Sequence, residues 1–357
     1  MTSPVVIRPL AIAVVLLALV ASWGCAGVGL EPEATQQPKL EAGRRRVPEG
    51  RPKVALVLGS GGTRAFAHIG VIKALEEAGI EPDLVVGSSA GAIVGALYSG
   101  GYRSAELEQL ALQLNPLAFL DISIFDNARA KGLALQEFIN LRLDGRPIER
   151  LPREFAAVAT RARDGAMQIF NYGDAGLAVR ASSATRRRFL PVKINGEEYI
   201  DGVESSPVPI PAARCLGADV VIAVNVQVRP ERLQPGSRWR DVLVFRQKMV
   251  DGEARDADFV IHPDTGDSMG LSESYRRHVI ARAEVDTREQ VAQIRAAIGT
   301  AGSVARGSSR PSADSDRDRR EPGIQPCTRS AFVAGPLSAA TSGAARRADG
   351  GVVRSIT

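Results

Sequence analysis

The residues with the clearest chemical potential form the pattern G-x-S-x-G at positions 87–91, with Ser89 at its centre. An apolar run precedes the pattern and a helical pattern follows it, which is the strand-to-helix context of a nucleophile elbow. In such an elbow a sharp turn presents the serine hydroxyl at a helix N-terminus, and Gly87 and Gly91 let the neighbouring backbone pass closely. The spacing therefore predicts Ser89 as a nucleophile.

A second pattern is the glycine-rich stretch 59–64, Gly-Ser-Gly-Gly-Thr-Arg, which also lies between an apolar run and a helical pattern. Backbone N–H groups at such a helix start form an anion cradle, either for a nucleotide phosphate or for the oxyanion of an acyl intermediate. The dinucleotide-binding pattern fails at Arg64, which occupies the third glycine position, and the phosphate-loop pattern is absent. The elbow about 25 residues downstream favours the oxyanion, with donors near Gly61, Gly62 and Thr63 and with Arg64 adding charge or bracing the loop.

A serine nucleophile needs a base, and the chain offers an aspartate and three histidines as candidates. His68 and His278 fit packing and solvated positions better than a catalytic one. His262 follows a candidate strand, and Ser89, Asp201 and His262 stand in the order of the α/β-hydrolase triad. A Ser–Asp–His triad is therefore one hypothesis for the base.

The other hypothesis is that Asp201 acts alone. Asp201 and Gly202 follow a hairpin-like stretch with an Asn195-Gly196 turn, and a proline-rich stretch, 207–211, comes after them. A lone Asp-Gly pair is usually an ordinary turn. A carboxylate presented on a tight turn can nevertheless accept the serine proton without a histidine when its pKa suits the reaction. The residues by themselves leave the dyad and the triad open.

Alternating strands and helices must position these residues. Short apolar runs that end at glycine or polar residues predict buried strands, and apolar positions three and four residues apart predict helices. Such alternation predicts an α/β layered fold with a mostly parallel central sheet. We expect strands at 54–58, 83–86, 155–160 and 219–226, and helices at 65–78, 90–99 and 104–114.

The composition argues against several other classes. The 357 residues are 45% hydrophobic and 24% charged, as in ordinary globular proteins. The net charge of +5 comes with only 5% aromatic residues, so we expect no nucleic-acid partner, while a weak attraction to anionic lipid is compatible. The three cysteines form no CxxC pair, and no Cys/His cluster has zinc spacing. We therefore expect no metal, no cofactor and no disulfide framework, and a single Cys215–Cys327 pair is the alternative.

The N-terminus has the pattern of a targeting segment. Arg8 precedes Leu10–Ala21, a run of twelve residues without a polar side chain, which fits a signal-peptide core better than a membrane span. Residues 22–24 and Cys25 resemble the cleavage box of bacterial lipoproteins, so Cys25 is a lipidation candidate. We expect export to the cell envelope and membrane anchoring, and an uncleaved membrane anchor is the alternative.

Taken in order, the glycine loop, the serine elbow and the Asp-Gly pair resemble the patatin-like phospholipases over about residues 52–261. The loop residues Gly61, Gly62 and Arg64 match the family's Gly-Gly-x-Arg. Ser89 matches its Gly-x-Ser-x-Gly nucleophile, and Asp201 matches the acid of its Asp-Gly motif. Further stretches similar to bacterial members follow the loop and flank the acid, at 68–71, 180–184 and 215–219.

This resemblance implies a three-layer α/β/α patatin-like fold and a Ser–Asp dyad without histidine. It further implies metal-free hydrolysis of lipid esters, by an enzyme of the phospholipase A or lysophospholipase type. The implied partners are a lipid or phospholipid ester and a membrane surface. The alternatives are a catalytically silent, membrane-associated binding protein of the same family and an esterase with the Ser–Asp–His triad. A nucleotide-binding domain is more distant. The head group, the acyl chain and the oligomeric state do not follow from the sequence.

The chain departs from the family pattern in three places. Ala65 stands where the loop usually has glycine, Val203 replaces a small residue after Asp-Gly, and Arg186, Arg187 and Arg188 stand where members often have Pro-Gly. A β-branched residue disfavours positive φ, so the turn at Val203 must differ or carry strain. The arginines either meet anionic head groups or are simply solvated.

The expected organisation has four parts. Apolar periodicity begins near residue 53 and is lost near residue 299, where serine, glycine, alanine and arginine take over. We expect a signal peptide or anchor at 1–25, a linker at 26–50, a patatin-like hydrolase domain at 51–298 and a disordered tail at 299–357.

Overall fold

The computed structural model describes residues 36–41, 47–48, 50–115, 121–123, 129–186, 188–233, 236–237, 239–266 and 269–307. All of them belong to one compact unit, Gln36–Thr357. The expected signal segment 1–25, with the lipidation candidate Cys25, lies outside the described residues, as does most of the expected tail.

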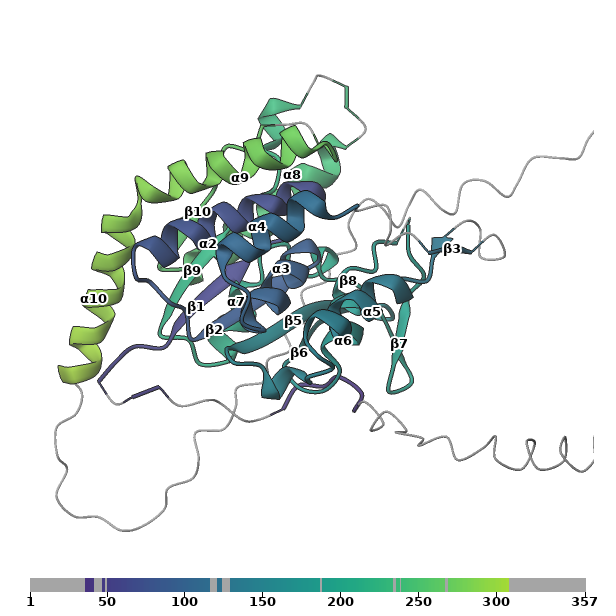
Figure 1. Ribbon diagram of the computed structural model, residues 1–357, viewed down its shortest axis with the longest axis horizontal. Helices are drawn as coiled ribbons and strands as arrows, with labels where there is room; N and C mark the ends of the chain where they lie inside the picture. Colours follow the sequence, from purple (N-terminus) through teal and green to yellow (C-terminus); the bar gives the residue numbers. More distant parts are fainter. Residues whose placement is uncertain are drawn as a thin grey trace, which may run out of the picture. The chain divides into compact units, whose positions relative to one another are not determined.

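An eight-stranded sheet forms the middle layer, in the order β10-β9-β1-β2-β5-β8-β7, with β6 also paired to β5 (Figure 1). The parallel strands are β1 (Val54–Leu58), β2 (Leu84–Ser88), β5 (Glu154–Arg161), β9 (Val220–Val224) and β10 (Phe259–Ile261). The antiparallel strands are β6 (Met167–Phe170), β7 (Val192–Ile194) and β8 (Glu197–Asp201). A separate pair joins β3 (Ile122–Ser123) to β4 (Arg129–Ala130).

Helices cover both faces of this sheet, which confirms the predicted three-layer α/β/α fold class. One face carries α2 (Ala67–Glu77), α3 (Ala90–Ser99), α4 (Ser104–Gln113), α5 (Leu133–Arg142), α6 (Ala175–Ser182), α9 (Glu273–Arg288) and α10 (Val291–Gly307). The other face carries α7 (Ile210–Cys215) and α8 (Arg240–Glu253). Short 3-10 helices lie between them: η1 (Gly62–Phe66), η4 (Ile148–Arg150), η5 (Gly202–Glu204), η6 (Pro230–Arg232) and η7 (Ala254–Asp256).

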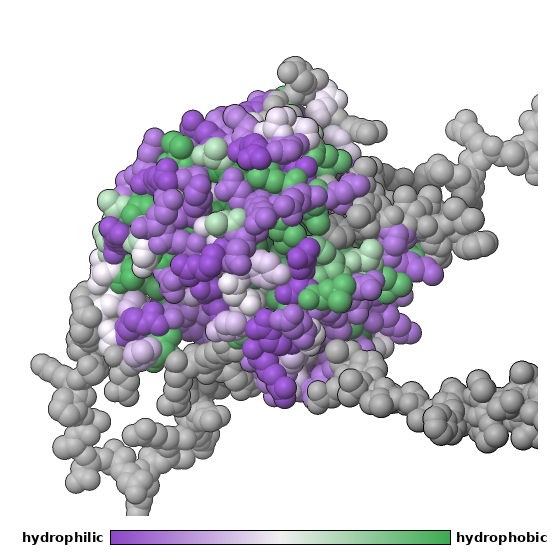
Figure 2. All heavy atoms as spheres, viewed as in Figure 1, coloured by the Kyte–Doolittle hydropathy of each residue, from purple (hydrophilic) through white to green (hydrophobic). Residues whose placement is uncertain are grey.

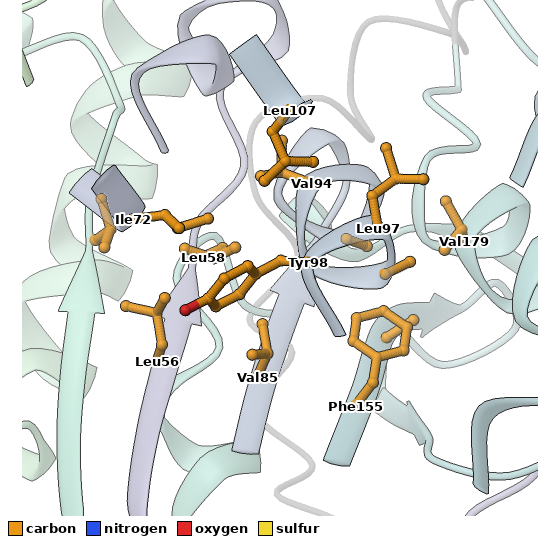
Figure 3. Packing of buried hydrophobic residues seen from close by; sticks show 14 of the residues in the cluster. Leu56, Leu58, Ile72, Val85, Val94, Leu97, Tyr98, Leu107, Phe155 and Val179 are labelled. Atoms are coloured by element: carbon orange, nitrogen blue, oxygen red, sulfur yellow. The ribbon is translucent and has the colours of Figure 1, made fainter. Parts of the chain in front are cut away.

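Side chains of β1 alternate between the two faces, because successive residues of a strand point to opposite sides of the sheet. Leu56 and Leu58 pack with α2 and α3, and Val57 packs with α7 on the other side. Figure 3 shows the ring of Tyr98, from α3, beside Leu56, Leu58 and Val85. Burial on both faces explains why the parallel strands are continuous apolar runs in the sequence.

The folded part is longer at both ends than we expected. Helix α10 continues to Gly307, past residue 299, because Ile294 is buried in the main core and Ile298 and Ala301 pack against it. In the expected linker, the backbone of Lys39 pairs with that of Tyr172, so residues 36–41 extend the domain.

Polar residues cover much of the outward side of α2, α4 and α9, with apolar ones scattered among them (Figure 2). None of the helices that the structure describes is both long and apolar enough to cross a membrane; the run Leu10–Ala21 lies outside that part. The same described residues contain no cluster of His, Cys, Asp and Glu suited to a metal ion. Cys215 is disulfide-bonded, and the other two cysteines are not among the described residues.

Candidate active site

Ser89 lies at the junction of β2 and α3, in a backbone conformation that serine rarely adopts. Its φ of 55° and ψ of −126° place it in a strained region, and such strain persists only where the surroundings hold it. The Ser89 amide donates to Ser182 Oγ at 2.9 Å, and that hydroxyl donates in turn to the carbonyl of Val158 at 2.5 Å. Ser182, at the end of α6, therefore ties the turn to strand β5.

The glycines that flank Ser89 are required by close packing. A Cβ on Gly91 would lie 2.1 Å from the carbonyl oxygen of Leu58 and 2.7 Å from that of Gly59. A Cβ on Gly87 would lie 2.4 Å from Cα of Ala92. Contacts below 3.0 Å are not found at real Cβ atoms. The elbow and the glycine loop after β1 are thus in direct backbone contact.

Asp201 is the last residue of β8, and the structure brings its carboxylate to Ser89. The Ser89 hydroxyl donates to Oδ2 of Asp201 at 2.8 Å, and the Thr185 hydroxyl donates to the same oxygen at 2.7 Å. The other oxygen, Oδ1, accepts the amide of Val203 at 2.9 Å. The Asp201 side chain is almost fully enclosed, since only 1% of the residue is exposed.

This environment changes the proton affinity of Asp201. Burial removes water and raises the pKa of the carboxyl above its ordinary value, because the charged form loses hydration. Hydrogen bonds from Val203, Thr185 and Ser89 oppose this rise, and so does the charge of Arg246 in α8. A carboxylate with a raised pKa accepts a proton more readily than one in water.

The turn after Asp201 does not require a positive φ at Val203. Gly202, Val203 and Glu204 form the 3-10 helix η5, and Val203 is not among the described non-glycine residues with positive φ. The β-branched Val203 therefore carries no backbone strain from a positive φ. Gly202 is needed instead for space, since a Cβ there would lie 2.2 Å from the Val158 carbonyl oxygen.

The glycine loop is anchored on one side. The amides of Gly59 and Ser60 donate to the carbonyls of Val224 and Pro207, at 3.0 and 2.8 Å. The amide group of the Gln227 side chain donates to the carbonyl of Ser60 at 2.5 Å and lies 2.7 Å from its hydroxyl. These bonds fix the first half of the loop from β9 and the segments that follow β9 and η5.

The second half of the loop presents its amides differently. The N–H groups of Gly61, Gly62 and Thr63 have no hydrogen-bond acceptor within the described part of the chain. Gly62 has a φ of +59°, which suits glycine, and it opens η1. Arg64 is 7% exposed and donates from Nε to the carbonyl of Val226 at 3.1 Å, so it braces the loop. Ala65 is buried inside η1 without positive φ.

The histidines take structural positions. His68, fully buried in α2, donates from Nε2 to the Gly59 carbonyl at 2.8 Å, and burial lowers its pKa to about 4. His262 follows β10 and donates from Nε2 to the Gln227 carbonyl at 3.1 Å; burial lowers its pKa too. His278 is exposed on α9. The hydrogen bonds of His68 and His262 therefore support the loop and the segment behind it, and the described contacts of Asp201 include no imidazole.

Sequence patterns missed Ser182, Thr185 and Gln227. Ser182 lies in the Ala-Ser stretch that resembled the family, which was a usable indication of its importance. Thr185 and Gln227 carried no motif, because their role depends on what the fold places opposite them. Arg186 and Arg188, which follow Thr185, are exposed, and Arg187 is outside the described residues.

The part of the chain that carries this site is similar to known proteins. The family model described as patatin-like phospholipase matches residues 56–214. An uncharacterized NTE family protein of Mycobacterium bovis is 36% identical over 178 residues, which are 49% of this chain and 49% of that protein. The human patatin-like phospholipase domain-containing protein 6 is 35% identical over 189 residues, 50% of this chain and 14% of that protein.

Among solved structures, VipD from Legionella pneumophila has a TM-score of 0.46 at 15% identity, over 72% of this chain and 70% of that one. The chain thus spans about half the length of the mycobacterial relative and a small part of the human one. Over residues 56–214, less than half of its 357 residues, the chain is thus similar to the patatin-like phospholipases.

Proposed function

We propose that this protein is a serine acyl hydrolase that cleaves lipid esters with Ser89 as nucleophile and Asp201 as its base. The observation that carries the proposal is the 2.8 Å hydrogen bond from Ser89 Oγ to a buried carboxylate oxygen, at the N-terminus of α3. A strained serine on a helix start, joined to a proton acceptor, is the arrangement of an activated nucleophile.

In the proposed first half-reaction, Ser89 Oγ attacks the ester carbonyl while its proton passes to Oδ2 of Asp201. The carbonyl oxygen becomes an oxyanion, and the amides of Gly61, Gly62 and Thr63 are the donors available to it. Removing one such donor typically costs ~10²–10³ in rate. The carbon–oxygen bond to the alcohol then breaks, and the proton on Asp201 goes to the departing oxygen.

In the second half-reaction, water attacks the acyl-serine. Asp201 takes a proton from this water as the water oxygen bonds to the acyl carbon. The ester bond to Ser89 Oγ then breaks, which releases the fatty acid, and the proton returns from Asp201 to Ser89 Oγ. No group outside the dyad and the loop is needed for the proton balance. The name of the matched family model, patatin-like phospholipase, and that of a relative from Coccidioides immitis, lysophospholipase NTE1, support phospholipids and lysophospholipids as the ester class.

The first test is covalent labelling combined with two substitutions. A fluorophosphonate should label the wild-type protein at Ser89, and Ser89→Ala should abolish both labelling and hydrolysis of a short-chain ester. Asp201→Asn should lower the rate by about 10⁴, in the range found when members of catalytic triads are removed. A correctly folded wild-type protein that takes no label would instead favour the catalytically silent binding protein.

His262→Ala separates the dyad from the triad. If His262 were the general base, its loss would cost about 10⁴ or more in rate. The dyad predicts less than about a tenfold loss, because His262 contacts only the carbonyl of Gln227 behind the loop. A loss of the larger size, in a variant with wild-type melting temperature, would reject the dyad.

We also propose that the enzyme is exported and held at a membrane by its N-terminal segment. The support is the apolar run Leu10–Ala21 and the lipoprotein-like box before Cys25. Labelled fatty acid should be incorporated into the full-length protein made in a bacterial host, and Cys25→Ala should abolish the incorporation. Membrane association that survives this substitution would favour an uncleaved anchor.

A further inference from the structure

Two hydroxyl groups donate to one oxygen of the Asp201 carboxylate. Ser89 Oγ is 2.8 Å from Oδ2 and Thr185 Oγ1 is 2.7 Å from it. The chemistry proposed above accounts for the first contact and makes no use of the second. Thr185 is partly buried, so its hydroxyl is not a fully solvated surface group.

The Asp201 carboxylate needs such donors because it must be ionised to accept a proton. A carboxylate enclosed to this extent prefers its neutral form unless hydrogen bonds or opposite charges replace its lost water. Arg246 of α8 is the described charge that favours ionisation, and its Nη2 is 3.7 Å from the carboxylate of Glu204, which weakens it. His68 and His262 are bonded elsewhere.

The contribution of Thr185 differs from that of Ser89 during the reaction. The Ser89 hydroxyl gives up its proton as it attacks, so it cannot hold Oδ2 throughout. The amide of Val203 binds the other oxygen, Oδ1. Thr185 therefore provides the donor to Oδ2 that persists through both half-reactions.

The backbone fixes Thr185 relative to Asp201. The amide of Asp201 donates to the carbonyl of Ala184, the residue before Thr185, at 3.1 Å. The carbonyl of Thr185 accepts the amides of Arg188 and Phe189, each at 2.9 Å. The threonine is thus held in a turn whose neighbouring residue is bonded to the acid itself.

We propose that Thr185 is a positioning residue, whose hydroxyl keeps Oδ2 of Asp201 ionised and aimed at Ser89. The inference rests on the proposed Ser89–Asp201 chemistry and adds the residue that sets the pH range in which that chemistry runs. Thr185→Val is nearly isosteric and removes only the donor. Thr185→Ser restores the hydroxyl.

The test is the pH dependence of kcat/KM for p-nitrophenyl butyrate in both variants. Activity requires ionised Asp201, and removing a donor to its carboxylate favours the protonated form. The acid limb of Thr185→Val should therefore move to higher pH by about one unit, so the variant should be about tenfold less active than wild type at a given pH on that limb and should recover on the alkaline side. Thr185→Ser should return the limb to its wild-type position.

Thr160→Val provides the matched control. The Thr160 hydroxyl also donates to Asp201, but to its backbone carbonyl, at 2.8 Å, and the residue is fully buried. This variant should lower the melting temperature and leave the acid limb in place. If Thr185→Val does not fold, the acid limb can be measured in Thr185→Ala, through the pH dependence of fluorophosphonate labelling.

An unshifted acid limb in Thr185→Val, while Ser89→Ala is inactive, would overturn the role of Thr185 and leave the dyad intact. A wild-type enzyme that is neither labelled nor active would defeat the proposed function itself. A loss of activity that is equal at every pH would assign Thr185 a purely structural role, which also contradicts the inference.

Discussion

The two sides of the candidate site are held by different kinds of contact. The elbow and the glycine loop follow the adjacent parallel strands β2 and β1, and they meet through backbone atoms, with Gly91 against the carbonyls of Leu58 and Gly59. Asp201 is the last residue of the antiparallel strand β8, and side-chain hydroxyls from Thr185 and Thr160 hold it. The nucleophile side should therefore be sensitive to added volume, and the acid side to lost hydrogen bonds.

This difference has a chemical reason. An oxyanion loop must present backbone amides at a fixed place, which close packing achieves without polar side chains. A buried carboxylate must stay ionised, which only donors or opposite charges can ensure. Each of the following predictions tests one side of the comparison.

Gly91→Ala should have the largest effect, because its Cβ would meet backbone atoms that cannot move aside. We expect loss of the folded protein, or a destabilisation above about 3 kcal/mol, measured by thermal or urea unfolding. Gly252→Ala is the control: it lies in α8 with nothing within 4 Å of the new Cβ, and alanine favours a helix by up to about 1 kcal/mol. A stable, active Gly91→Ala protein would contradict the backbone contact.

Gln227→Met should reduce catalysis without preventing folding. The substitution keeps the shape of the side chain and removes the donor to Ser60 that anchors the loop. We expect kcat to fall by about 10- to 100-fold with little change in KM, because a displaced oxyanion donor affects the transition state more than the bound ester. An increase in KM alone would show that Gln227 serves substrate binding and not the loop.

His68→Gln should reduce the loss of folding stability at low pH. Because burial lowers the pKa of His68 to about 4, the folded protein binds its proton less readily than the unfolded chain does. Stability should fall by about 3 kcal/mol as the pH drops from about 6.5 to about 4, and the glutamine variant should lack this component. Urea unfolding at several pH values measures how the free energy of unfolding changes with pH. The same pH dependence in both proteins would contradict this prediction.

Asp201→Asn should have the smallest effect on stability, and it should stabilise the protein where the preceding substitutions destabilise it or reduce its activity. Burial raises the pKa of Asp201 in the folded state, so stability falls as the pH rises through the interval between its unfolded and folded values. The inactive variant should therefore melt at a higher temperature than wild type at neutral pH, and the difference should shrink in acid. A lower melting temperature at neutral pH would mean that the ionised carboxylate stabilises the fold.

Much of the nucleophile side was predictable because short local sequence patterns specify its strands and helix. We expected strands at 54–58 and 83–86 and a helix at 90–99, and the structure has β1 at Val54–Leu58, β2 at Leu84–Ser88 and α3 at Ala90–Ser99. The hairpin turn was equally readable, since Asn195 and Gly196 both have positive φ, as an Asn-Gly turn predicts. The C-terminal end of the folded part could not be predicted in this way, because α10 is held by the packing of Ile294 in a core that includes strands far away in the sequence.

The sequence by itself determined the elements and the chemical types of the site: a serine on a strand-to-helix turn, a glycine-rich loop and an acid on a turn. The tertiary structure places the His262 ring against the carbonyl of Gln227, 35 residues away in the chain, a partner that no sequence pattern indicated. The placement of Thr185 on Asp201 likewise depends on the fold, which bonds the amide of Asp201 to the carbonyl of Ala184. Periodicity reports which face of an element is buried; only the packed chain decides which polar groups share that buried space.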